Sequence, residues 1–178
     1  IPLVTLGTFL LWFGWFGFNG FSQLAMGTFD DVNAISKIAV NTHLAGAAGT
    51  FTGAAITRII GGKTDIVMML NGALAGLVAI TAEPLTPGPI TAMFIGSIGA
   101  IIMYFGTKML ENYKLDDVVG AIPVHMFAGI FGTLVVPLSN ANTSFGAQLL
   151  GVISVCLFSF IFSFIIFKGL KETIGLRI

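Results

Sequence analysis

The stretch VVGAIPVHMFAGIFGTLVVPL, from Val118 to Leu138, contains a single ionisable side chain, that of His125. An imidazole at the depth of a lipid bilayer is costly unless it faces a cavity or finds a partner. Two interpretations follow: His125 marks a route for ions or protons, or it hydrogen-bonds between packed helices and serves only cohesion. We favour the route, because ionisable groups inside membranes usually mark such pathways.

The rest of the chain has the composition of an integral membrane protein. Of its 178 residues, 56% are hydrophobic and 9% are charged, whereas soluble domains carry about a quarter charged residues. Five further apolar stretches approach the ~20 residues that a membrane-spanning helix needs. We therefore predict one all-α membrane domain over residues 1–178, with six transmembrane helices at 3–26, 32–57, 66–81, 90–110, 118–138 and 145–167.

The basic residues predict the orientation of these helices. The connections 83–88 and 139–144 contain no Lys or Arg, and Lys37 is the one basic residue near the alternate side. Excess positive charge marks the cytoplasmic side of a membrane. The remaining basic residues lie at the second and fourth connections and after the last span, and they are Arg58, Lys63, Lys108, Lys114, Lys168, Lys171 and Arg177. We therefore expect a protein of the cell (inner) membrane whose chain starts and ends on the cytoplasmic side.

Several classes of function find no support in the sequence. The net charge is zero and no basic cluster indicates nucleic acid. We find no nucleophile–base set, metal-ligand cluster or phosphate loop, so we expect neither an enzyme nor a bound metal or cofactor. Cys156 is the only cysteine and is interpreted as a packing residue. The chain opens at Ile1 without a methionine, and we expect it to be part of a longer protein.

Glycines and phenylalanines indicate how the helices meet. Small residues spaced three or four apart let helix backbones approach closely in lipid. The last predicted span is instead rich in phenylalanine, which is typical of a helix at the lipid-facing rim. The glycines that predict close packing are Gly46, Gly49, Gly53, Gly72, Gly76, Gly129 and Gly132.

An aromatic stripe follows the first predicted helix. Trp15, Phe18 and Ser22 lie three and four residues apart and therefore share one helix face. Aromatic faces with a hydroxyl beside them can attract a small cation through the ring quadrupole and one hydrogen bond. An aromatic belt at the membrane boundary, or plain core packing, explains the same pattern equally well.

These segments resemble the ammonium transporter (Amt/Mep/Rh) family. The similarity lies in LWFGWFGFNG at 11–20, NGALAGLVAIT at 71–81, and the pair Asp116–Asp117 that leads to Val124–His125. It covers essentially the whole chain, in order. The resemblance implies an eleven-helix fold of two inverted five-helix halves and a final helix, of which this chain would be helices six to eleven. It also implies a homotrimer with one pore in each subunit, completed by the missing N-terminal half.

The resemblance also assigns roles to individual residues. His125 is similar to the second member of a pair of pore histidines, and Phe18 to one of two stacked phenylalanines that close the outer mouth. Ser22 matches a hydroxyl of the outer ammonium site, and Trp15 lies along the pore wall. Asp117 and His43 are secondary candidates, and His43 is either a packing residue, which we favour, or a local substitution near the pore.

The chain departs from the family pattern at four positions. Gly120 stands where an aspartate is usual, Pro123 and Met126 flank the histidine where glycines are common, and Phe21 replaces a small residue. We expect Phe21 to narrow the outer mouth and Pro123 to kink the helix just before His125.

Three hypotheses follow. The first is transport of ammonium, captured and deprotonated at the outer site, through a hydrophobic pore lined by histidine. The alternative is an ammonium-sensing membrane domain of a receptor with a kinase or cyclase, which conducts little or nothing. The third, which the order of the motifs disfavours, is an unrelated helical bundle in which His125 and the aromatic residues only pack.

Overall fold

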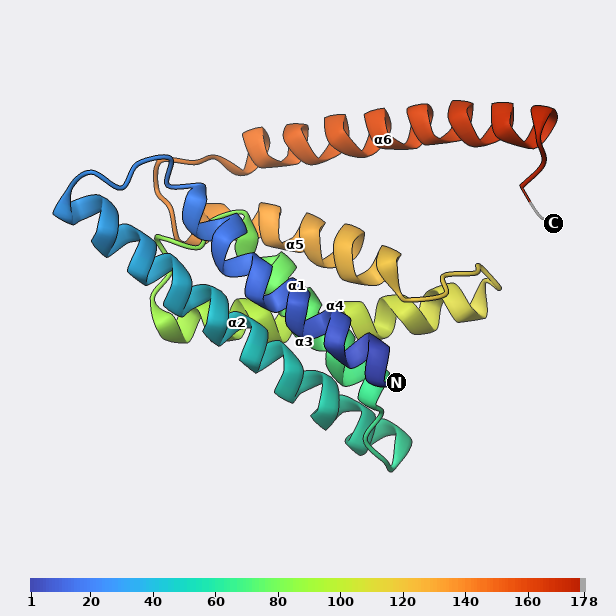
Figure 1. Cartoon of the computed structure of the whole chain (residues 1–178), viewed down its shortest axis with the longest axis horizontal. Coiled ribbons are helices and arrows are strands. Elements are labelled where there is room, and N and C mark those ends of the chain that lie inside the picture. Colours follow the sequence, from blue (N-terminus) through green and yellow to red (C-terminus); the bar gives the residue numbers. More distant parts are fainter. Residues whose placement is uncertain (177–178) are drawn as a thin grey trace.

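The computed structural model describes residues 1–176 and contains helices and no strands within that range (Figure 1). Arg177, one of the basic residues used above to predict the orientation, lies outside the described residues. The π-helix η1 and the 3-10 turn η2 flank α5 and continue it at both ends. The elements are α1 (Pro2–Phe21), α2 (Phe29–Gly61), α3 (Ile66–Thr81), α4 (Pro89–Asn112), η1 (Ile122–Phe127), α5 (Ala128–Val135), η2 (Val136–Leu138) and α6 (Phe145–Thr173).

The predicted spans correspond to these helices, with two corrections. The span 66–81 coincides with α3, and 32–57, 90–110 and 145–167 lie within α2, α4 and α6. The first helix ends at Phe21 instead of Met26, and Leu24 in the following loop takes a left-handed backbone with φ 60. The fifth begins near Ile122 instead of Val118, after a turn at Gly120 with φ 77. Apolar composition marks the membrane region but does not show where the backbone leaves the helix.

Within residues 1–176, three helices are long and apolar enough to cross a membrane, namely α1, α4 and α6. The segments Ile66–Thr81 and Ile122–Leu138 are shorter apolar helices. The prediction of an all-α membrane protein is confirmed.

The helix α3 forms the centre of the packed part of the molecule. Ten of its 16 residues are buried, and it contacts α1, α2, α4 and α5. The backbones of α2 and α3 touch, because a Cβ built on Gly72 would lie 2.6 Å from the carbonyl oxygen of Gly49. The close approach predicted from these glycines is therefore present.

Buried polar side chains in the described residues are hydrogen-bonded. Asn19 Nδ2 of α1 donates to Thr42 Oγ1 of α2 at 3.0 Å. Asn41 Nδ2 donates to the carbonyl oxygens of Pro84 and Pro87, at 2.9 and 2.8 Å, and so fixes the loop before α4. Polar groups in a membrane need such internal partners, because lipid offers none.

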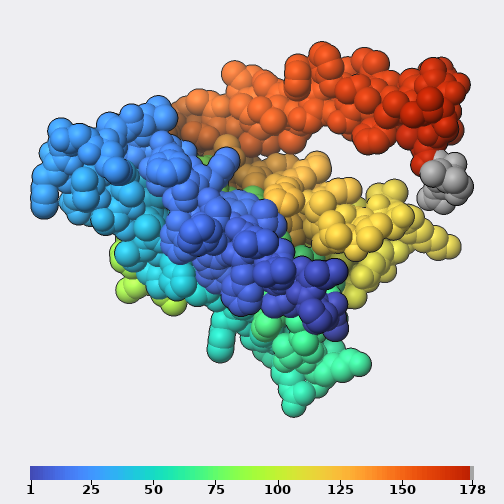
Figure 2. Space-filling view, viewed as in Figure 1, coloured from blue at the N-terminus to red at the C-terminus, as the bar shows by residue number. Residues whose placement is uncertain are grey.

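The helix α6 lies apart from the other five helical segments. None of its residues is buried in this chain. Figure 2 shows it running alongside the packed helices with an open space between them. This space is a cavity of about 800 Å³, lined from α5 and η1 on one side and from α6 on the other.

Candidate functional site

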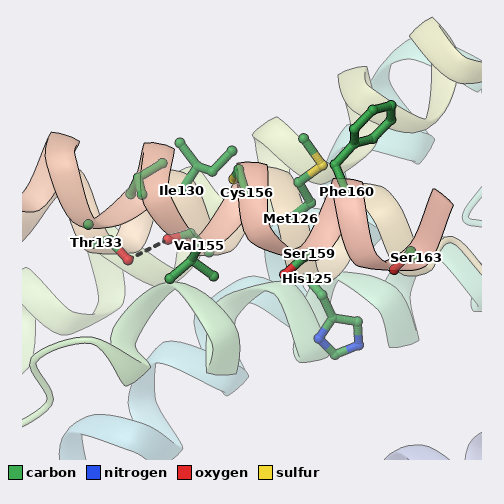
Figure 3. Close-up of a pocket in the computed structure, with 12 residues that line it drawn as sticks. His125, Met126, Ile130, Thr133, Val155, Cys156, Ser159, Phe160 and Ser163 are labelled. Carbon is green, nitrogen blue, oxygen red and sulfur yellow. Dashed lines mark hydrogen bonds between the residues drawn. The ribbon is translucent and has the colours of Figure 1, made fainter. Parts of the chain in front are cut away.

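His125 lies in the π-helix η1 and is exposed in this chain. It lines the cavity between α5 and α6, together with Met126 and Thr133 on its own side and Ser159 on α6. Figure 3 shows the imidazole at one edge of this cavity, with the ring pointing away from the labelled apolar side chains. Short π-helical segments occur frequently at functional sites, because the extra residue in the turn redirects the side chains.

The turn before η1 explains two of the four departures from the family pattern. Pro123 has no backbone N–H, so it cannot bond the carbonyl oxygen of Val119 four residues earlier. Asn71 Nδ2 of α3 donates to that oxygen instead, at 3.0 Å. A Cβ at Gly120 would lie 2.6 Å from the same Nδ2, and Gly120 has φ 77. A side chain at position 120 is therefore disfavoured both by backbone strain and by a steric clash with the Asn71 side chain.

Pro123 does not kink a continuous helix, and the expectation that it would was wrong. It is the second residue of η1, in the first turn, where proline is tolerated because an N–H at that position has no partner within the helix. The backbone upstream of it is already a turn. His125 therefore lies close to the start of its helix.

Asp117 caps the start of that helix. Its Oδ1 accepts a hydrogen bond from the N–H of Ala121 at 2.9 Å, and its Oδ2 accepts one from Ile122 at 2.8 Å. The first N–H groups of a helix have no partner within the helix, and a carboxylate there also interacts favourably with the helix dipole. Asp117 thus fixes the turn from which the helix of His125 begins.

Trp15 is half-buried between α1 and α3. Its Nε1 donates to Thr81 Oγ1 at 2.7 Å, and Thr81 donates in turn to the carbonyl oxygen of Leu77 at 2.6 Å. The rings of Trp15 and Phe18 meet edge to face, with centroids 6.1 Å apart. Trp15 also packs on the buried cluster that contains Val124. One core cluster therefore supports both Trp15 and the residue before His125.

Phe18 and Ser22 line an open hollow of about 540 Å³ at the end of α1. Ser22 is the residue that ends the helix, and its hydroxyl donates to the carbonyl oxygen of Phe18 at 2.8 Å. A hydroxyl that has donated its hydrogen keeps its lone pairs for an incoming donor. The full lining is Gly14, Gly17, Phe18, Phe21, Ser22 and Leu24.

His43 lies on a different face from these residues. Its ring lies between those of Trp12 and Phe16, with centroids 5.6 and 6.1 Å away. Phe18 follows Trp12 by six residues, roughly 240° around a helix, so the two side chains point about 120° apart around α1. The structure therefore does not bring His43 together with Phe18 and Ser22. It also shows no group of three potential metal ligands within residues 1–176.

Sequence reasoning missed Asn71 and Thr81 as supporting residues. Both are polar residues in the apolar segment 66–81, and that is the only signal that the sequence offers. Their partners lie 48 and 66 residues away along the chain. Neither partner can be identified without the tertiary structure.

Comparison with known proteins gives a consistent result. The profile of the Ammonium Transporter Family matches residues 1–178. The ammonium transporter Amt2 of Archaeoglobus fulgidus is 40% identical and aligns with 100% of this chain and 42% of its own length. The putative ammonium transporter sll1017 of Synechocystis sp. is also 40% identical, over 98% of this chain and 43% of its own.

Solved structures agree with the sequences. A structure described as a Sensor Amt Protein superposes with a TM-score of 0.90, at 35% identity, over 99% of this chain and 45% of its own. Candida albicans Mep2 superposes with a TM-score of 0.86, at 28% identity, over 98% of this chain and 42% of its own. The chain spans less than half the length of these relatives. Because the family profile matches all of its residues, the chain belongs to the ammonium transporter family.

Proposed function

We propose that the full-length protein transports ammonium across a cell membrane and that this chain supplies half of the pore wall. The observation that carries the proposal is the exposed imidazole of His125 at the edge of the cavity between α5 and α6. The relatives are more than twice as long as this chain. The N-terminal half of the same protein would then cover His125 and the hollow beside Phe18.

The outer hollow is suited to bind a small cation that donates hydrogen bonds. The ring of Phe18 attracts positive charge, and Ser22 Oγ can accept an N–H because its own hydrogen is bonded to the Phe18 carbonyl. The N–H of Trp15 is held by Thr81, so Trp15 offers only its ring. Ammonium and potassium ions are similar in size, but only ammonium can donate to Ser22.

Beyond the hollow the pathway would carry the neutral molecule. A charged group in an apolar lumen is costly, whereas ammonia is not charged. An imidazole can both donate and accept a hydrogen bond and changes its charge near neutral pH. We propose that ammonium transfers its proton to water at the open outer hollow and that His125 provides polar contacts for ammonia deeper in the membrane.

The proposed assembly follows the family. The chain would cross the cell (inner) membrane six times, as helices six to eleven of the complete protein, with its C-terminus in the cytoplasm. Three copies would form a homotrimer in the lipid bilayer. The basic residues at the connections Arg58–Lys63 and Lys108–Lys114 support this orientation.

Uptake by the full-length protein in liposomes tests the proposal. We expect ammonium uptake by the wild type and a loss of at least about tenfold in His125→Ala, whereas His43→Ala, the matched change at the other membrane histidine, keeps it. Such a loss corresponds to roughly 1.4 kcal/mol or more. The 178-residue chain alone should give no uptake. Wild-type activity in His125→Ala, or uptake by the chain alone, would contradict the proposal.

A sensing role is the second candidate, and one comparison favours it. The solved structure with a TM-score of 0.90 is described as a sensor. A sensor should bind ammonium while conducting little in the same liposomes, and the gene should encode a kinase or cyclase beyond Ile178. Rapid uptake by the wild type and a reading frame without such a module would exclude this candidate.

A further inference from the structure

Phe21 forms a wall of the outer hollow that family resemblance does not account for. A Cβ built on Gly17 would lie 3.4 and 3.7 Å from Cε2 and Cδ2 of Phe21. The ring is therefore folded back along α1 and lies over the backbone of Gly17. It cannot retreat further toward the helix, because only backbone lies beneath it.

The hollow has a floor of glycine and walls of phenylalanine. A Cβ on Gly14 would meet nothing within 4 Å, so this residue leaves open space beneath the rings. Phe21 follows Phe18 by three residues, which places the two side chains roughly 60° apart around the helix. Both line the same hollow as Ser22. A cation that reaches Ser22 Oγ through this hollow therefore passes beside these rings.

We propose that Phe21 sets the size limit for cations at the outer mouth, so that ammonium is accepted better than methylammonium. The inference rests on the proposed function and adds a specificity-determining residue to it. The two cations carry the same charge and both donate hydrogen bonds, so Ser22 and Phe18 alone separate them poorly. The Phe21 ring, which already lies against the backbone of Gly17, would exclude the additional methyl group by contact.

A series of variants at position 21 tests the size limit. The full-length protein is reconstituted in liposomes, and transient currents are recorded with ammonium chloride and with methylammonium chloride. Such currents report charge displaced by binding as well as by conduction, so a sensor also gives a signal. We expect the ratio of methylammonium to ammonium response to rise about tenfold in Phe21→Ala, at the low end of what one methyl group contributes in an apolar pocket. The ratio should rise less in Phe21→Leu and fall in Phe21→Trp.

Phe13→Ala is the matched control for this series. Phe13 lies on the same helix and is 79% exposed, against 77% for Phe21, but it does not line the hollow. Its removal should leave the ratio unchanged. The melting temperature of every variant is measured in parallel to detect loss of packing against the rest of the protein.

The outcomes separate this inference from the proposed function. A wild type that responds to neither salt overturns the proposed function, and the size limit with it. A wild type that responds, with a ratio that does not change with the size of residue 21, overturns the size limit alone. If the position-21 variants have a lower melting temperature but an unchanged ratio of methylammonium to ammonium response, the size limit is likewise overturned and Phe21 serves packing.

Discussion

The indole Nε1 of Trp15 donates a 2.7 Å hydrogen bond to Thr81 Oγ1, and this contact joins α1 to the last residue of α3. Trp15 lies one turn before Phe18, whose ring it meets edge to face. The bond therefore holds the helix that carries Phe18 and Ser22 against the most buried helix of the chain. The residues around the hollow at the end of α1 are thus tied to the core.

We predict that Trp15 and Thr81 are energetically coupled. Trp15→Phe and Thr81→Val should each lower the free energy of unfolding of the full-length protein, by about 1 kcal/mol for the lost hydrogen bond. The double variant should lower the free energy of unfolding by less than the sum of the two single effects, because both single changes remove the same hydrogen bond. Unfolding midpoints in detergent measure this cycle. Fully additive effects would show that the bond contributes nothing.

Removal of the Ser22 hydroxyl should weaken ammonium binding. A hydrogen bond to a charged group contributes roughly 1.5 kcal/mol or more, which corresponds to about a tenfold rise in KM for Ser22→Ala. Ser22→Thr retains the hydroxyl and should stay close to the wild type. Concentration dependence of uptake in liposomes gives both values. An unchanged KM in Ser22→Ala would show that the Ser22 hydroxyl does not contribute to ammonium binding.

Position 120 should not accept a side chain. Gly120→Ala combines a left-handed backbone with a Cβ at 2.6 Å from Asn71 Nδ2, and the strain alone costs about 1–2 kcal/mol. We expect a lower melting temperature and reduced uptake. Gly151→Ala, where a Cβ meets nothing within 4 Å in this chain, is the control and should have little effect. Equal effects of the two changes would contradict the account of this turn.

The cap formed by Asp117 should position His125. Asp117→Ala removes the acceptor for the N–H groups of Ala121 and Ile122, and loss of such a cap costs about 0.5–2 kcal/mol. Because the freed turn precedes His125 directly, uptake should fall along with stability. Asp117→Asn, which still accepts one bond, should restore part of both. Asp116→Ala changes the adjacent, exposed carboxylate and serves as the control. Similar losses in both alanine variants would argue against a specific role of the cap.

Much of the fold follows from patterns that are local in the sequence. The apolar segment 66–81 is α3, residue for residue, because a membrane helix is marked by uninterrupted apolar composition. The glycine spacing in 46–53 and 72–76 predicted the contact between α2 and α3, because only small residues allow backbones to meet. The ends of α1 and η1 were misplaced, because Val118, Val119 and Leu24 are as apolar as helical residues.

The sequence by itself determined the class of the protein, its helical segments and which aromatic and polar residues share a helix face, since composition and helical spacing fix these features. Only the tertiary structure decided how these side chains are held. Thr81 binds Trp15 across 66 residues and Asn71 binds Val119 across 48. Such pairs depend on how α3 packs against its neighbours, and that packing is a property of the whole assembly of helices.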